Sequence, residues 1–541
     1  RATVLDWVSY GSPIQDSCGR REVWSQKHPR TLNPMATTEQ APPPADEATG
    51  SDAKHFKVAI VGSGFSGLGM AIRLKQEGID DFVVFERADD VGGTWRDNTY
   101  PGVACDVPSH LYSFSFAPNP GWSRTFSPGH EIQDYLRRCA GHFDVIPHVR
   151  FRHAVTEARW DDVAQRWEID TTQGRFTAQV LVAGMGGLSE PKIPDIPGLA
   201  TFEGAAFHTA QWDHEVDLRG RRVAVLGTGA SSIQVVPQIQ PQAEKLHLFQ
   251  RTPAWIMPHP DRPISARERT VYKRLPLAQR AMRAAIYWAR ETFVIPFVRP
   301  KLAQLPESQA RKHLAKQVKD RELRRKLTPD YTIGCKRILI SNDYYPALSQ
   351  PNVELVTDGI KEIRPHSIVS SDGSEREVDA IVFGTGFRVT DMPAAELVRG
   401  RDGRTLSETW SGSMQAYLGT SIAGFPNLFM LVGPNTGLGH NSIVFMIESQ
   451  VEYVLGALRT MDAQGVASVD VRREVQDAYN AGLQERLEGT VWSTGGCASW
   501  YLDDTGRNTT LWPGSTWPFR RHTRRFDPSL YTLNKRARAP V

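Results

Sequence analysis

The sequence holds 541 residues, which exceeds the usual size of one hydrophobic core and predicts two or three domains. Apolar residues make up 40% and charged residues 23%, and no stretch reaches the roughly 18–20 consecutive apolar residues that span a bilayer. No transmembrane segment is therefore expected. The net charge is only +4, and no nucleic-acid partner is expected.

The five cysteines are odd in number and widely scattered along the chain. They form no C-x-x-C pair and have no metal-ligand spacing, so we expect no metal site. This usage is typical of a reducing compartment. It predicts a cytoplasmic protein without structural disulfides.

Four segments follow one another along the chain. Residues 1–54 are predicted to be a disordered tail, because residues 36–54 are small, polar and rich in proline. The expected domains are 55–200 as the first part of one domain, 201–375 as a second domain, and 376–541 as the second part of the first domain with a C-terminal lobe. A helical insertion is expected at 262–330 within the second domain.

The first cofactor motif lies in residues 57–69, KVAIVGSGFSGLG. A buried parallel strand leads into Gly62-x-Gly64-x-x-Gly67, and a helix follows. The three glycines permit the tight turn, the approach of a pyrophosphate and close packing of helix on strand. The next strand ends in Glu86, 22 residues after Gly64, where a carboxylate would bind ribose hydroxyls. This combination predicts that the first domain, residues 55–200 with 376–541, binds FAD.

A second copy of the motif lies in residues 222–233, RVAVLGTGASSI, with Ser232 in place of the third glycine. At the same offset from Gly229 stands Arg251 instead of an acid, followed by Thr252. An arginine suits a 2′-phosphate, so the second site is predicted to bind NADPH. Arg251 as an ordinary surface arginine at a strand end is the alternative. Two such folds in one chain indicate a doubly wound α/β flavoprotein with a resident FAD and a visiting reductant.

The helical block is strongly basic. Residues 262–328 hold 18 Lys and Arg against five Asp and Glu, although apolar positions such as Leu275, Leu277, Met282, Ile286 and Trp288 interrupt the charges. We expect a solvated helical face, with a membrane surface as the less favoured alternative.

Between the two motifs stands Phe202-x-Gly204-x-x-x-His208-x-x-x-Trp212-Asp213. This string resembles the fingerprint F-x-G-x-x-x-H-x-x-x-W-P/D of the type I Baeyer–Villiger monooxygenases, which are class B flavoprotein monooxygenases. The resemblance extends from about Phe56 to the C-terminus and implies a glutathione-reductase-like pair of Rossmann folds. The segments 97–116 and 500–514 look most like the 4-hydroxyacetophenone monooxygenase branch.

The resemblance also implies a set of site residues. It places Arg337 over the flavin and Asp106 beside it as the catalytic pair, His208 outside the reacting centre, and Trp500 on a mobile loop near the nicotinamide. The predicted cofactor contacts around the first motif are Gly62, Gly64, Phe65, Ser66, Gly67, Glu86, Gly93, Thr94, Trp95, Tyr100, Asp106, Asp379, Gly386 and Asn435. Those around the second are Gly227, Thr228, Gly229, Ser231, Ser232, Arg251, Thr252, Lys336 and Trp500.

The implied reaction consumes NADPH and O2. NADPH would reduce FAD, O2 would add at flavin C4a, and the resulting peroxyflavin would insert one oxygen atom next to a ketone carbonyl to give an ester or lactone. Arg337 is the expected partner of the anionic peroxide because a guanidinium stays protonated at any working pH. Asp106 is expected to hold it.

Three other functions share parts of this pattern. A flavin monooxygenase that oxidises nitrogen or sulfur in small molecules has both glycine turns and is the main alternative. A disulfide reductase would need a redox-active cysteine pair, and Cys105 has no partner at the required spacing. A non-catalytic nucleotide sensor is disfavoured by the presence of Arg337 and of both turns. The particular ketone is not encoded by any motif, and we expect a monomer or dimer.

Overall fold

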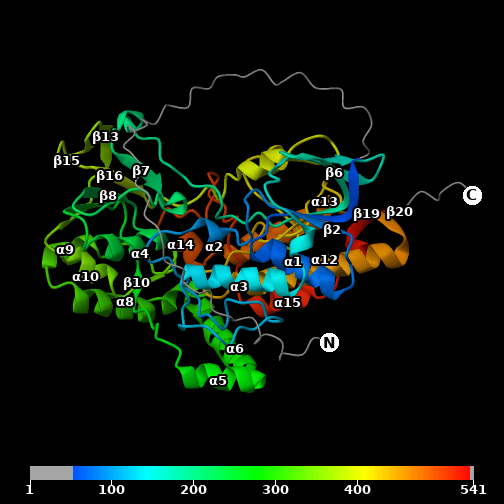
Figure 1. The fold of residues 1–541 in the computed structure, drawn as a ribbon, viewed down its shortest axis with the longest axis horizontal. Helices are drawn as coiled ribbons and strands as arrows, with labels where there is room; N and C mark the ends of the chain where they lie inside the picture. Colours follow the sequence, from blue (N-terminus) through cyan, green and yellow to red (C-terminus); the bar gives the residue numbers. More distant parts are fainter. Residues whose placement is uncertain (1–52, 536–541) are drawn as a thin grey trace, which may run out of the picture.

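The computed structural model describes residues 53–535. The predicted tail at 1–54 therefore lies outside the described residues except at its end, where Lys54 already begins the first strand, β1 (Lys54–Val61). Two folds stand side by side in Figure 1: the first sheet with α1 and α3 on the right, and the second sheet with α4, α9 and α10 on the left.

The first sheet has the strand order β17-β4-β5-β6-β1-β2-β3, with β18 also pairing with β6. Its central strand β1 runs parallel to β2 and β6. Val58 and Ile60 point into one apolar core and Ala59 into another, so both faces of the strand are buried, as expected for parallel sheets. The strands are β2 (Phe82–Phe85), β3 (Val149–Arg150), β4 (Val155–Asp161), β5 (Arg166–Thr171), β6 (Gly174–Ala183), β17 (Val398–Arg399) and β18 (Leu428–Met430).

Helices cover one face of this sheet. α1 (Phe65–Gln76) packs against β1 and against the long C-terminal helix α12 (Ile443–Gln464), which also contacts α15 (Thr516–Thr523). The C-terminal segment thus completes the first fold. Further helices on this face are α2 (Thr94–Asp97), α3 (Gly129–His142) and α13 (Arg473–Leu487). By contrast, α11 (Leu406–Trp410) packs in the core on the opposite face, and α14 (Val491–Thr494) packs against residues 295–298 of the helical insertion. Strand β19 (Val466–Val471) pairs with β20 (Tyr531–Lys535).

The second sheet, in the order β12-β9-β8-β16-β7, is entirely parallel. In β8 the side chains of Val223 and Val225 enter one core and those of Ala224 and Leu226 the other. The strands are β7 (Ala205–His208), β8 (Arg222–Leu226), β9 (Lys245–Phe249), β12 (Val353–Val356) and β16 (Ala380–Phe383), with α4 (Ala230–Ile239) and α10 (Tyr344–Leu348) against them. The predicted fold class, two Rossmann-like folds, is confirmed.

The expected domain boundary at 375/376 needs one correction. Residues 380–383 form β16, which lies between β8 and β7 in the second sheet, so the chain returns to the first fold only after this strand. The return path runs beside the outward connection: Phe387 bridges Pro191, and Lys192 N–H donates to the Gly386 carbonyl at 2.9 Å. Two adjacent connections therefore join the folds.

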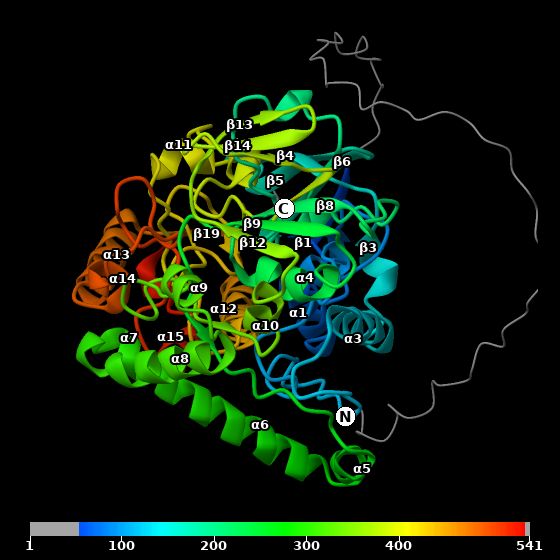
Figure 2. The ribbon, with the colours of Figure 1, turned by 90° about the vertical axis from the view of Figure 1, so that its left-hand side faces the viewer.

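The predicted helical insertion is present between β9 and β12. It contains α5 (Ala266–Arg274), α6 (Pro276–Glu291), α7 (Ile295–Val298), α8 (Gln304–Gln317) and α9 (Arg321–Lys326). Figure 2 shows α6 as a long helix running below α7 and α8 at the lower edge of the molecule. Short strands β10 (Ile256–Met257) and β11 (Leu339–Ile340) flank the insertion, and β13 (Ile360–Arg364), β14 (Ser367–Ser370) and β15 (Glu375–Glu377) form a small antiparallel sheet.

Candidate active site

The first glycine turn connects β1 to α1 in a geometry that only glycine fits. Gly62 has φ +91°, and a Cβ added at Gly67 would lie 1.8 Å from the Gly62 carbonyl oxygen. Gly64 caps α1, and the nearest atoms to a Cβ there would be backbone atoms of Gly93, at 3.6 Å, and Gly92, at 3.9 Å. The turn thus leaves room for a ligand phosphate at the amino end of α1, as a dinucleotide fold requires.

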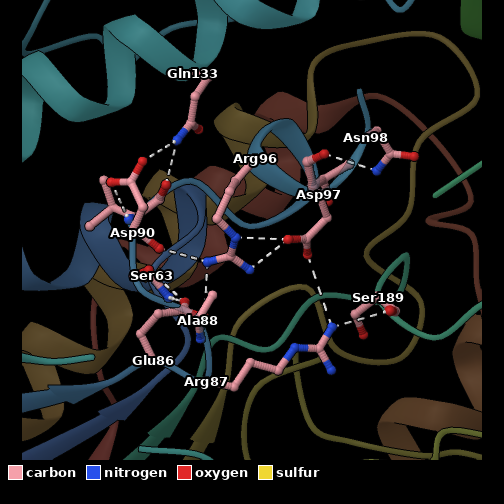
Figure 3. Close-up of polar contacts among 12 residues, drawn as sticks. Ser63, Glu86, Arg87, Ala88, Asp90, Arg96, Asp97, Asn98, Gln133 and Ser189 are labelled. Carbon is pink, nitrogen blue, oxygen red and sulfur yellow. Dashed lines mark hydrogen bonds and ion pairs between the residues drawn. The ribbon is translucent and has the colours of Figure 1, made fainter. Parts of the chain in front are cut away.

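Glu86 lies directly after β2 and only 4% of it is exposed. One carboxylate oxygen accepts from the Ser63 N–H at 3.0 Å and the Ser63 hydroxyl at 2.6 Å. The other accepts from the Ala88 N–H at 2.9 Å and pairs with Arg96 at 2.9 Å, as Figure 3 shows. A ribose hydroxyl would have to replace one of these donors, and the Ser63 hydroxyl is the one that rotates freely.

A second glycine pair crosses over the first turn. Gly93 has φ +54°, and its Cβ would lie 3.1 Å from the Gly64 Cα. The following helix α2 carries Thr94, which is exposed, and Trp95, whose indole N–H donates to the Tyr112 hydroxyl at 3.2 Å. These residues adjoin the phosphate turn. By contrast, the Phe65 ring is buried in the core, so Phe65 and Ser66 can offer a ligand mainly their backbone N–H groups.

Asp106 and Arg337 form the central ion pair. The Arg337 Nε and Nη2 both donate to one Asp106 oxygen, at 2.9 and 2.5 Å. Asp106 raises the already high pKa of the Arg337 guanidinium. Burial acts to raise the pKa of the Asp106 carboxyl, but Arg337, with a smaller effect of Arg290, lowers it overall. Both groups therefore stay charged. About a third of the Arg337 side chain is exposed, so the guanidinium is accessible.

A third charged residue, Arg290 of α6, was not predicted from the sequence. Its Nη2 donates to the Asp106 backbone carbonyl at 2.9 Å, and burial lowers the pKa of its guanidinium. Tyr501 is buried near Arg337 and Asp106, and burial raises the pKa of its phenol to about 12, so this phenol stays neutral. The helical insertion and the C-terminal lobe thus both reach the central ion pair.

The second glycine turn repeats the first with one exchange. Gly227 has φ +105°, and a Cβ there would lie 2.5 Å from the Gly384 carbonyl oxygen. Ser232 fits at the third position because Gly384 faces it: a Cβ on Gly384 would approach the Ser232 hydroxyl to 1.9 Å. A small residue on one strand therefore compensates for the missing glycine on the helix.

Two cations lie beside this turn. The Thr228 hydroxyl donates to the Thr252 carbonyl at 3.0 Å and so ties the turn to the segment that carries Arg251. Arg251 is exposed and forms no ion pair within residues 53–535. Burial and, secondly, the charge of Arg251 lower the pKa of Lys336, so the two cations are close enough to repel one another. Ser231, the second residue of α4, is half-buried nearby. A 2′-phosphate would neutralise this pair.

Asp379 was predicted to contact FAD, but the structure places it at the far edge of the second sheet. It precedes β16 at the amino end of the second sheet, where its carboxylate accepts from the Arg222 N–H at 2.8 Å and pairs with the Arg222 guanidinium at 2.7 Å. Nucleotides bind at the carboxyl ends of parallel strands, so Asp379 stabilises the second fold from the opposite edge.

Two further predicted contacts, Tyr100 and Asn435, have other partners. Tyr100 donates to the Gln234 side chain of α4 at 2.9 Å and belongs to the core of the second fold. The Asn435 amide donates to the carbonyls of Asn508 at 2.7 Å and Leu511 at 3.0 Å, which fixes the C-terminal lobe. Trp500 is 45% exposed, as expected for a loop residue.

A disulfide joins Cys335 to Cys497, with the Cα atoms 6.1 Å apart. The prediction of no structural disulfide is wrong because these cysteines are 162 residues apart in sequence and meet only when the C-terminal lobe packs on the helical insertion. The bridge links the residue before Lys336 to the segment that carries Trp500.

The paired dinucleotide folds and the central ion pair are typical of a flavoprotein monooxygenase, and comparison with known protein families agrees. Residues 55–274 match the family model described as flavin-binding monooxygenase-like. The chain is an enzyme of the monooxygenase class.

The particular family follows from relatives that cover nearly the whole chain. The sequence is 55% identical to a Baeyer–Villiger monooxygenase of Streptomyces coelicolor over 90% of this chain and 94% of that protein. It is 53% identical to one of Pseudomonas aeruginosa over 90% and 93%. The chain therefore belongs to the Baeyer–Villiger monooxygenases.

Solved structures give the same result. An oxidised steroid monooxygenase bound to NADP matches with a TM-score of 0.79 at 30% identity, over 89% of this chain and 100% of that one. A Rhodococcus cyclohexanone monooxygenase bound to NADP⁺ matches with a TM-score of 0.80 at 28% identity, over 90% and 100%. The 4-hydroxyacetophenone branch stays a prediction.

Proposed function

We propose that the protein binds FAD at the first glycine turn and NADPH at the second, and inserts one oxygen atom of O2 next to a ketone carbonyl. The products are an ester or lactone, NADP⁺ and water. The observation that carries the proposal is the Arg337–Asp106 ion pair, a fixed accessible cation placed where the two folds meet the helical insertion.

The residues present fit both cofactors. Gly62, Gly64 and Gly67 leave the amino end of α1 open to a pyrophosphate, and Glu86 stands at the end of β2 as a ribose ligand. Arg251 and Lys336 supply two positive charges beside the second turn, which favours NADPH over NADH. FAD, when bound and reduced by NADPH, supplies the chemistry that activates O2.

Arg337 supplies fixed positive charge to the reaction. Because Asp106 raises the pKa of the guanidinium, Arg337 does not act as an acid or base and keeps its charge throughout. It stabilises negative charge that develops on the attacking oxygen and on the ketone oxygen as the carbonyl carbon becomes tetrahedral. Asp106 holds the side chain by two hydrogen bonds to one oxygen, and Arg290 fixes the Asp106 backbone.

The test offers acetophenones, cyclic ketones and sulfides to the holoenzyme with NADPH and O2. An ester or lactone from at least one ketone is expected. Sulfoxide or N-oxide formation with every ketone left unchanged would instead assign the protein to the alternative, a nitrogen or sulfur oxidase. Cytoplasmic localisation and a monomeric or dimeric state stay predictions; no helix within the described residues is both long and apolar enough to cross a membrane.

A further inference from the structure

Exposed apolar side chains gather on one part of the molecule. Of the 15 large apolar residues that are exposed in the described chain, nine lie between residues 271 and 305. They include four of the five positions that the sequence pattern led us to expect in a solvated helical face: Leu275, Leu277, Met282 and Trp288. Isolated exposed apolar residues are ordinary, but a cluster of this size in one helical segment indicates a docking surface.

Helix α6 has two faces with different partners. On the inner face Gln279 donates to the Asn119 carbonyl at 2.7 Å and Arg283 to the His110 carbonyl at 2.8 Å, so this face is fixed to the first fold. On the outer face Leu277 is 74% and Trp288 58% exposed. Their separation of 11 residues corresponds to three helical turns and places them on one side of the helix.

The charge of the same segment is almost entirely positive. Residues 266–305 contain nine Lys and Arg but only two acids. Both acids are already bound: Glu268 caps α5 and pairs with Arg262 at 2.7 Å, and Glu291 is buried against Asn441. Five exposed cations form no ion pair within residues 53–535: Arg267, Arg269, Lys273, Arg274 and Arg280.

We propose that this basic apolar surface, residues 266–305, docks on an anionic lipid bilayer. The exposed apolar side chains enter the boundary between headgroups and acyl chains, and the unpaired cations bind the anionic headgroups. Figures 1 and 2 both show α5 and α6 at one edge of the molecule, away from the two sheets, where they can meet a flat surface. The mode is peripheral, since none of the described helices can span a bilayer.

Charge decides between a bilayer and a second copy of the chain. A two-fold symmetric contact would bring the same cations of both copies together, with a net charge of +7 in residues 266–305 of each copy (nine basic minus two acidic residues). An anionic bilayer neutralises these charges while it covers the apolar residues. The inner face of α6 also carries Arg290, so the docked helix is the one that holds Asp106.

The test is co-sedimentation of the full-length holoenzyme with vesicles of phosphatidylcholine alone or mixed with phosphatidylglycerol. Binding to the anionic vesicles that weakens with added salt is expected. The charge variant Lys273→Gln/Arg274→Gln/Arg280→Gln should lower the partition coefficient about a hundredfold, at about fivefold for each cation removed. The apolar variant Leu277→Ser/Trp288→Ser should lower it at least about tenfold.

Matched controls are Val163→Ser and Lys361→Gln, which lie near β4 and on β13, far from α6 in the ribbon views. These variants should bind vesicles as the parent does, and NADPH oxidation without vesicles should match the parent in all variants. Failure of the parent to sediment with anionic vesicles, or equal binding by the parent and both surface variants, would overturn the proposal. So would a dimer in lipid-free solution that the apolar variant converts to a monomer.

Discussion

Replacing Arg337 with alanine should separate reduction of the flavin from insertion of oxygen into the ketone. The substitution removes two hydrogen bonds to one Asp106 oxygen, at 2.9 and 2.5 Å, together with the accessible positive charge. Within residues 53–535 no hydrogen bond or ion pair joins this side chain to either glycine turn. Binding and oxidation of NADPH should therefore continue in the variant.

The expected losses of rate and of stability in Arg337→Ala follow from the geometry of the ion pair. Loss of one charged donor that stabilises a developing oxyanion lowers the rate about 10²–10³-fold. About a third of the Arg337 side chain and a quarter of the Asp106 side chain are exposed. Breaking this pair should therefore cost less stability than the about 3–5 kcal/mol lost when a fully buried pair is broken. We expect a loss of stability of about 1–3 kcal/mol, which leaves a folded enzyme to assay.

The assay measures three quantities: anaerobic reduction of the flavin by NADPH, hydrogen peroxide released under air, and ester formed from a ketone. In Arg337→Ala the first should stay within about threefold of the parent, the second should rise, and the third should fall about 10²–10³-fold. Arg337→Lys keeps the charge but lacks the planar donor pair, so ester formation should recover only in part. Ester formation by Arg337→Ala at the parental rate would remove this residue from its role.

Three further predictions concern the turns and the disulfide. Arg251→Ala should raise the KM for NADPH about tenfold or more with little change for NADH, and equal effects on both cofactors would contradict 2′-phosphate recognition. Gly67→Ala places a Cβ 1.8 Å from a backbone carbonyl oxygen, so it should lower the free energy of unfolding by about 1–3 kcal/mol and reduce the FAD content. In the control Gly482→Ala the new Cβ has no atom within 4 Å, so thermal melting should show a neutral or stabilising effect. Cys497→Ser should lower the free energy of unfolding by about 2–5 kcal/mol, and an unchanged Tm in both this variant and the dithiothreitol-treated parent would show that the bond to Cys335 is absent in solution.

Local sequence signals predicted the fold well, since each depends on residues close together in the chain. Both glycine turns have the expected strand-turn-helix context, and positive φ at Gly62 and Gly227 explains why those positions are glycine. Ser232 could be accepted as a small third residue from the sequence. Its structural reason, a glycine at position 384 facing it, depends on a strand more than 150 residues away.

Features that depend on long-range packing were the ones missed. The family resemblance implied that Asp379 contacts the flavin, but the register of β16 against β8 places it beside Arg222. The meeting of Cys335 with Cys497 and the reach of Arg290 to Asp106 both require the helical insertion to be positioned in space. No spacing rule encodes such contacts.

The most direct test of the central claim is the fate of O2 during turnover. The purified enzyme is given a ketone, NADPH and O2 labelled with heavy oxygen, and the product is analysed by mass spectrometry. The account predicts an ester or lactone that carries one labelled oxygen atom for each NADPH consumed in coupled turnover. Unlabelled ester, or no ester from any ketone while sulfides are oxygenated, would contradict it.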